Sequence, residues 1–300
     1  MTATRPMGPA EWLSLLTLSV LWGGSFFFNE LAIEGFDPFS VTLWRVGIAG
    51  AVLWGYLRVR GIALPTAAAD WRAFLVMGAL NNLIPFTLIA WGQIRIDSGL
   101  AAIFNAATPL FTVLLAHVLT TDERLNGHKA FGVLIGIAGV AVLIGPGALR
   151  GLDGPMLGQL AVVAATVSYA CAGIFGKRMT RHPPAASAAG MLLGAAAMSV
   201  PMAFLFGQPL DSTFSAVSVG GIVGLGTVST ALAYIIYFRL LARSGATNLL
   251  LVTLLIPASA GLLGVAFLGE SLNGHAFWGM GLIALGLGAV DGRVLRCFRR

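Results

Sequence analysis

The chain has 300 residues, of which 57% are hydrophobic and only 10% charged, and its mean hydropathy is +0.88. A soluble domain of this length needs far more charge on its surface, so the composition excludes that class and favours a membrane protein. The net charge of +6 raises nucleic-acid binding as an alternative, which depends on where the basic residues lie.

Apolar runs of about 20 residues, the length that crosses a hydrocarbon core, recur along the whole chain. We predict ten membrane-spanning helices in chain order, at residues 12–31, 39–57, 73–94, 99–119, 130–147, 156–176, 187–207, 217–241, 248–268 and 276–292. These runs lack the period-2 alternation of a membrane β-barrel, so the predicted fold class is all-α integral membrane. The first run carries no cleavage signal and is predicted to stay as the first helix.

A motif after the fourth run recurs after the ninth, which indicates an internal duplication. Residues 123–132 read ERLNGHKAFG and residues 270–279 read ESLNGHAFWG, so that Glu, Leu, Asn, Gly, His and the closing Gly recur 147 residues later. We predict two repeats, residues 1–150 and 151–300, with five helices each. Because five is odd, the second repeat must be inverted relative to the first, as in many secondary transporters with a central cavity.

Lysine and arginine are unevenly divided between the two ends of the predicted helices. With the N-terminus in the cytoplasm, fifteen of them lie inside and two, Arg95 and Arg150, lie outside. Corresponding loops also differ in sign, since residues 30–37 carry three acids where the second repeat has Lys177, Arg178 and Arg181. The positive-inside rule predicts an inner-membrane protein with both termini cytoplasmic, and it accounts for the basic excess without nucleic acid.

Several of these segments resemble the drug/metabolite transporter superfamily, EamA type. The resemblance rests on residues 21–25 (LWGGS), on 44–45 (WR), on 105–116 with Pro109, on 123–125, and on Pro257 followed by 268–272 and the glycine-rich last helix. It implies ten helices in two inverted repeats around a central cavity that moves small metabolites. Within the superfamily, the chain is most similar overall to bacterial aromatic amino-acid exporters of the YddG type.

A solute needs a polar path through the bilayer, where polar side chains are otherwise unfavourable. The candidate substrate-binding residues near the expected midplane are Trp22, Asn81, Asn82, Asn105, Thr108, Tyr169, Ser229, Tyr234 and Thr253. The alternative is that each hydrogen-bonds a neighbouring helix, which contributes about 0.6 kcal/mol. The strongest pair is Asn81–Asn82, because Pro85 follows closely and interrupts the helix.

Two further features of the helices have a functional and a structural interpretation. Pro109 and Pro257 stand at matching places and are expected to kink their helices, either as gates or as static bends. Arg45 is the one charge clearly inside a predicted helix. We expect it to form a structural salt bridge with Glu30, Glu34 or Asp37, the alternative being attraction of a substrate carboxylate.

Glycines cluster in the fifth and tenth helices, at residues 132, 136, 139, 279, 281, 286 and 288. Small residues at such spacing let helices approach closely, so these glycines either pack the two repeats together or form a homodimer face.

The predicted function is a secondary transporter that exports small metabolites by alternating access, with amino acids of aromatic preference as the expected substrates. Other small amphipathic compounds or drugs are the alternative substrates, and a passive channel stays open as another class. A membrane-embedded enzyme is disfavoured, because the four histidines share no metal spacing and no acid pairs lie in the core. No cofactor and no metal are expected. No Asp or Glu lies at mid-depth, so facilitated transport and proton antiport both remain open.

Overall fold

The computed structural model describes residues 7–120, 126–145, 154–176, 179, 181–210, 215–249, 251–271 and 274–291, and every regular element within them is a helix. Several features singled out above lie outside the described residues: the half boundary near Gly151, the first motif copy at Glu123, and the cations Lys177 and Arg178.

The first half forms five successive helical rods, and the third and fourth of them are each built from more than one element. The elements are α1 (Pro9–Ile33), α2 (Pro38–Val59), α3 (Ala68–Gly78), the π-helical η1 (Ala79–Leu83), α4 (Ile84–Gln93), α5 (Ser98–Asn105), α6 (Thr108–Leu119) and α7 (Gly127–Ile144).

The second half repeats this order of rods. Its elements are α8 (Gly154–Gly176), α9 (Pro184–Phe206), α10 (Ala216–Val223), the π-helical η3 (Gly224–Leu232), α11 (Ala233–Leu249), α12 (Val252–Leu263), the π-helical η4 (Gly264–Leu268) and α13 (Gly274–Asp291). In the described part of the chain, eight rods are long and apolar enough to cross a membrane, and two shorter apolar ones lie at Val252–Leu268 and Gly274–Val290.

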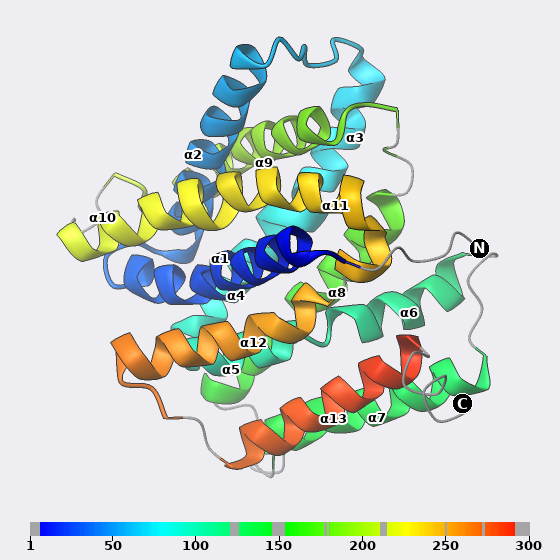
Figure 1. The fold of residues 1–300 in the computed structure, drawn as a ribbon. Coiled ribbons are helices and arrows are strands. Elements are labelled where there is room, and N and C mark those ends of the chain that lie inside the picture. The colour runs from blue at the N-terminus through cyan, green and yellow to red at the C-terminus, as the bar shows by residue number, and fades with distance from the viewer. Residues whose placement is uncertain are drawn as a thin grey trace.

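The rods pack side by side in one bundle (Figure 1). In this view α1 lies between α11 and α12, α2 and α3 flank α9 at the upper edge, and α7 and α13 pair at the lower edge; the same helices are in contact. Each of these contacts joins an element of the first half to one of the second.

One helix is longer than its predicted span, although the apolar rod there, Ala216–Leu241, agrees with the predicted 217–241. The eighth helix continues through α11 to Leu249, beyond the predicted end at residue 241, and the next helix begins at Val252 rather than at residue 248. Residues 242–249 contain no proline, so nothing removes a backbone donor and the hydrogen-bond ladder continues.

The two matched prolines differ in structure. Residues 106–107 form a turn that separates α5 from α6 just before Pro109, whereas Pro257 lies inside the continuous α12. Pro109 has no N–H for the carbonyl of Asn105, and the hydroxyl of Thr108 donates to that carbonyl instead, at 2.7 Å. The helix is thus broken just before Pro109, whereas α12 continues through Pro257.

Glycines bring α7 and α13 into close backbone contact. A Cβ atom on Gly286 would stand 2.6 Å from the carbonyl oxygen of Gly132, and one on Gly139 would stand 2.9 Å from that of Gly279. Only residues without a side chain allow this approach. These four glycines therefore pack the two halves together within one chain, the first of the two roles expected for them.

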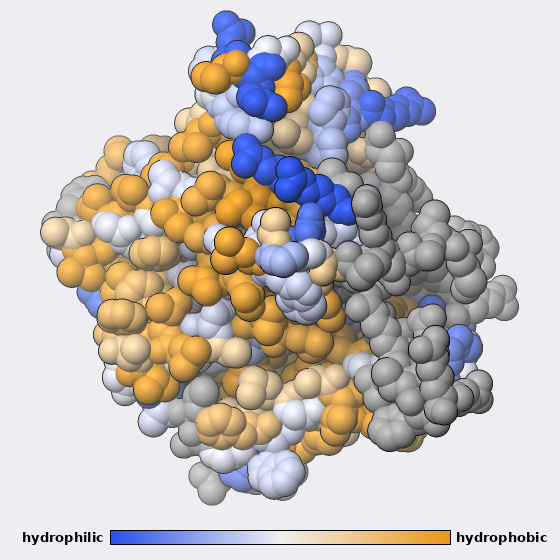
Figure 2. All heavy atoms as spheres, viewed as in Figure 1, coloured by the Kyte–Doolittle hydropathy of each residue, from blue (hydrophilic) through white to orange (hydrophobic). Residues whose placement is uncertain are grey.

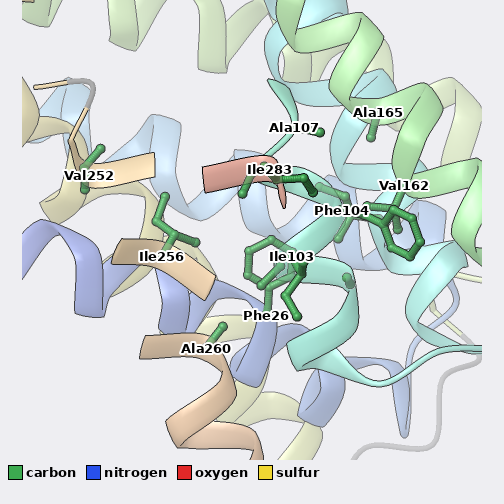
Figure 3. Close-up of a cluster of buried hydrophobic side chains, with 14 of the residues drawn as sticks. Phe26, Ile103, Phe104, Ala107, Val162, Ala165, Val252, Ile256, Ala260 and Ile283 are labelled. Carbon is green, nitrogen blue, oxygen red and sulfur yellow. The ribbon is translucent and has the colours of Figure 1, made fainter. Parts of the chain in front are cut away.

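The interior of the bundle is apolar and drawn from both halves (Figure 3). Phe26 of α1, Ile103 and Phe104 of α5, Val162 of α8 and Ile256 of α12 lie buried in one cluster. The outer surface is apolar as well, and the face in Figure 2 is mostly hydrophobic. Large side chains such as those of Phe131 and Leu285 are more than half exposed, as expected for helices in contact with lipid.

Candidate functional site

A cluster of polar side chains lies inside this apolar bundle, where helices of the two halves meet. We call Arg45, Asn81, Asn82, Thr230 and Tyr234 the central polar cluster. Arg45 comes from α2, the two asparagines from η1, Thr230 from η3 and Tyr234 from α11. Arg45, Asn82 and Thr230 are almost fully buried, with 6%, 0% and 1% of their surface exposed.

The asparagines take their positions from a widened helical turn. Pro85 has no N–H to donate to the carbonyl of Asn81, and the preceding turn relaxes so that Ile84 donates to the carbonyl of Ala79, five residues back. Such π-helical turns are often found at functional sites, because they rotate successive side chains away from the regular helical stripe. Both Asn81 and Asn82 lie in this turn.

The corresponding rod of the second half is also π-helical, over the nine residues of η3. Gly226 in η3 lies against Ile48 of α2, and a Cβ atom there would stand 2.7 Å from the Ile48 side chain. This close approach brings Thr230 within reach of Arg45.

Two hydrogen bonds of the cluster connect the halves of the chain. Arg45 Nε donates to Thr230 Oγ1 at 3.1 Å, and Asn81 Nδ2 donates to the hydroxyl of Tyr234 at 2.9 Å. Asn82 lies close to Tyr234 as well, but its two amide atoms are buried without a hydrogen-bond partner. A buried amide without hydrogen-bond partners is unfavourable in an apolar bundle. The cluster therefore contains hydrogen-bonding atoms, those of Asn82, that its own residues leave unpaired.

Aromatic rings adjoin the cluster on one side. Tyr234, Tyr237 and Phe238 follow one another on α11, and the Tyr234 and Phe238 rings stack with centroids 5.9 Å apart. Trp22 of α1 meets the ring of Tyr237 at 5.6 Å. Tyr169 of α8 lies within electrostatic range of the Arg45 guanidinium. The predicted residues Trp22, Tyr169 and Tyr234 are therefore neighbours of one polar site.

The other predicted site residues make contacts of a more local kind. Thr108 donates to the carbonyl of Asn105, whose own side-chain oxygen is buried and unpartnered. The buried hydroxyl of Ser229 also has no partner and lies near Gly24 of α1. Thr253 is half-buried on α12. The hydrogen bonds described for these residues do not join them to the central polar cluster.

Arg45 does not form the salt bridge expected from the sequence. Its guanidinium lies 3.6 Å from the centroid of the Phe86 ring, and its Nε bonds Thr230. The acids proposed as partners are engaged elsewhere: Asp37 accepts the backbone N–H groups that begin α2, and Glu30 accepts from Gln93. The carboxylate of Asp37 is needed as a helix cap, and Arg45 turns inward instead.

Three contributors to polar sites were not predicted from the sequence. Phe86 and Tyr237 look like ordinary core aromatics until their partners are known. The third, Gln93, is 3% exposed and links Asn29, Glu30 and the carbonyl of Phe26 near the expected outer end of α1. An uncharged amide at the end of an apolar run was the signal available for it.

The second copy of the repeated motif has a definite contact. Glu270 accepts the backbone N–H groups of Ser98 and Gly99 at 2.8 and 3.0 Å, so it caps the N-terminus of α5 from a distant part of the chain. Partial burial and the neighbouring charge of Glu270 raise the pKa of Asp97, beside the same terminus. The second motif copy therefore anchors the segment just after η4 to the N-terminus of α5.

Comparison with known proteins gives consistent results over nearly the whole chain. The sequence profile of the EamA-like transporter family matches residues 10–145 and again residues 156–290. A probable amino-acid metabolite efflux pump of Escherichia coli (strain K12) is 32% identical over 289 residues, with 92% of each chain covered.

Other relatives are less similar in sequence and match most of the chain. The uncharacterized transporter YoaV of Bacillus subtilis (strain 168) is 21% identical over 276 residues, covering 92% of this chain and 94% of the relative. The biotin transporter of Escherichia coli (strain K12) is 26% identical over 227 residues, covering 74% and 73%. A solved crystal structure superposes with a TM-score of 0.66 at 22% identity, over 95% of this chain and 98% of that one, and so shares the fold.

Proposed function

The chain belongs to the EamA-like transporter family, and from this premise we propose that it exports amino acids, aromatic ones in particular, by alternating access. Membership makes it a multi-pass membrane transporter rather than an enzyme. The names of the relatives mention different substrates, an amino-acid metabolite in one and biotin in another. The substrate of this chain must therefore be argued from its own site.

The proposed architecture is ten transmembrane helices in two inverted repeats, residues 1–150 and 151–300, around a central cavity. Its support is the double match of the family profile and the pairing of equivalent rods, α2 with α9 and α7 with α13. The third rod and its equivalent, the eighth, each carry a π-helical segment in the middle. Alternating access then consists of rocking one repeat against the other about a fixed site.

The proposed orientation places both termini in the cytoplasm and the protein in the inner membrane. Its support is the excess of Lys and Arg on one side, fifteen against two. The loop that holds Glu34 then faces outward, and the loop that holds Arg58 and Arg60 faces inward.

The proposed substrate site is the central polar cluster with its aromatic neighbours. The carrying observation is that two polar contacts between the halves, the buried Arg45–Thr230 and the partly buried Asn81–Tyr234, lie beside the rings of Trp22, Tyr169 and Tyr237. Aromatic rings suit an aromatic side chain, and the amides suit an amino-acid head. The remaining predicted residues complete the proposed path: Asn105, Thr108, Ser229 and Thr253.

Counterflow in proteoliposomes tests this function. Vesicles preloaded with each of the twenty amino acids in turn are expected to accumulate labelled tryptophan only when they contain tryptophan, tyrosine, phenylalanine or another large apolar amino acid. The same assay with and without a pH gradient distinguishes facilitated transport from proton antiport. Absence of exchange for every amino acid contradicts the proposal, and an uptake that rises linearly without saturation points to a channel.

A further inference from the structure

Arg45 is a buried cation without a counter-ion. It lies in the second turn of α2 and is 6% exposed, and it forms no ion pair with any residue that the structure describes. A charged side chain within a membrane helix is unfavourable, and such residues usually pair with another charge or mark a functional site. A side chain kept there without a partner calls for a role beyond packing.

The guanidinium is held in a defined plane. The Phe86 ring covers one face at 3.6 Å, and the hydrogen bond from Nε to Thr230 fixes the rotation of the group. Only Nε is engaged in this way. Across the described residues, the two Nη groups have no hydrogen-bond acceptor.

The neighbours of these Nη groups are polar but uncharged. The hydroxyls of Tyr169 and Tyr234 lie within electrostatic range, and the orphaned amide of Asn82 is close to Tyr234. The nearest acids that the sequence offered, Asp37 and Glu30, are bound to other groups. The site therefore has a surplus of donors and one positive charge.

We infer that Arg45 binds the carboxylate of the transported molecule through its Nη groups, with the Asn82 amide bonding the adjacent polar group of the same molecule. A planar guanidinium and a carboxylate match as a bidentate pair, which supplies both the missing charge and the missing acceptors. The site then selects small monocarboxylates, including zwitterionic amino acids, over amines or amides of the same shape. The inference rests on the proposed function for its location and deepens it by naming the group recognised.

The test compares matched acid and amide pairs on the intact purified protein. The pairs are tryptophan and tryptophan amide, phenylalanine and phenylalanine amide, and indole-3-propionic acid and its amide. Their affinities follow from the concentration dependence of the thermal unfolding midpoint. Since a hydrogen bond to a charged group contributes roughly 1.5–3 kcal/mol, the wild type is expected to bind each acid about 10- to 100-fold more tightly than its amide.

Variants assign this selectivity to one residue. Arg45→Gln is expected to bind acid and amide equally, and Arg45→Lys to recover only part of the difference, because a point charge lacks the bidentate fork. The matched control is Arg58→Gln, since Arg58 lies exposed above the Trp54 ring at the end of the same helix. It is expected to keep the wild-type ratio.

The outcomes separate this inference from the proposed function. Equal binding of acids and amides by the wild type overturns the inference, even if tryptophan exchanges in counterflow and Arg45→Gln does not fold. Retained selectivity in Arg45→Gln, or no binding of any acid, overturns it as well. If indole-3-propionic acid binds selectively while no amino acid exchanges, the inference holds and the amino-acid function fails.

Discussion

At the scale of single residues, some polar groups of the bundle hydrogen-bond one another, and others are buried without a hydrogen-bond partner. Asn81 and Tyr234 satisfy each other across the two halves, whereas Asn82 and the side-chain oxygen of Asn105 remain buried without partners. Native proteins rarely leave such groups unpaired, which supports the proposal that a substrate binds beside Asn82.

The Asn81–Tyr234 contact gives a prediction at this scale. Tyr234→Phe removes the hydroxyl that accepts from Asn81 and keeps the ring that stacks on Phe238. We expect transport to fall about tenfold in tryptophan counterflow while stability changes by less than about 1 kcal/mol, because a single interhelical hydrogen bond contributes little to membrane-protein folding. Tyr56→Phe, near the end of α2, is the control. Unchanged transport by Tyr234→Phe removes this hydroxyl from the site.

At the scale of elements, the contact between α7 and α13 depends on the absence of side chains. Gly286→Ala would place a Cβ atom 2.6 Å from the Gly132 carbonyl, whereas Gly281 on the same helix has open space around it. We expect Gly286→Ala to destabilise the protein by about 1–3 kcal/mol through overpacking. Gly281→Ala is expected to be neutral or slightly stabilising, since alanine favours the helix. Equal unfolding midpoints for the two variants in detergent contradict the packing described here.

The prolines of the fourth and ninth rods give a second prediction for elements. We propose that both gate the transport path, with the larger effect at Pro109, where the helix is already broken. Pro109→Ala restores a donor for the Asn105 carbonyl and lets α5 and α6 join, so exchange is expected to slow strongly with little loss of folded protein. Pro257→Ala, inside α12, is expected to slow exchange less. Normal exchange rates in both variants rule out gating and leave static bends.

At the scale of the whole molecule, orientation is the open prediction. Glu34 lies just before α2 and Arg60 just after it, so the two exposed residues stand at opposite ends of this helix. In a background without Cys171 and Cys297, Glu34→Cys is expected to react with a membrane-impermeant maleimide in intact cells, because the positive-inside rule places it outside. Arg60→Cys is expected to react only after permeabilisation. The reverse pattern inverts the topology, and reaction of both in intact cells contradicts a membrane crossing by α2.

Much of the helical plan was accessible from the sequence. Hydropathy over about 20 residues locates membrane helices because every backbone group in lipid must be satisfied within its own segment. The same local signals singled out Asn81, Tyr169 and Tyr234 as polar residues in apolar runs; Asn81 bonds Tyr234, and Tyr169 and Tyr234 pack against the same cluster. The π-helical turns were not predicted, since they arise from how Pro85 and the packed glycines relax within the bundle.

The sequence by itself determined an apolar, helical, duplicated transporter chain, because composition, hydropathy and repeats depend only on the order of residues along the chain. Only the tertiary structure decided the partners: Arg45 faces Phe86 and Thr230 rather than the acids of its own loop, and a turn precedes Pro109 but not Pro257. Partners depend on the rotation and axial register of each helix. Those are set by close packing between segments far apart in the chain, at contacts such as Gly226 against Ile48, which no local pattern encodes.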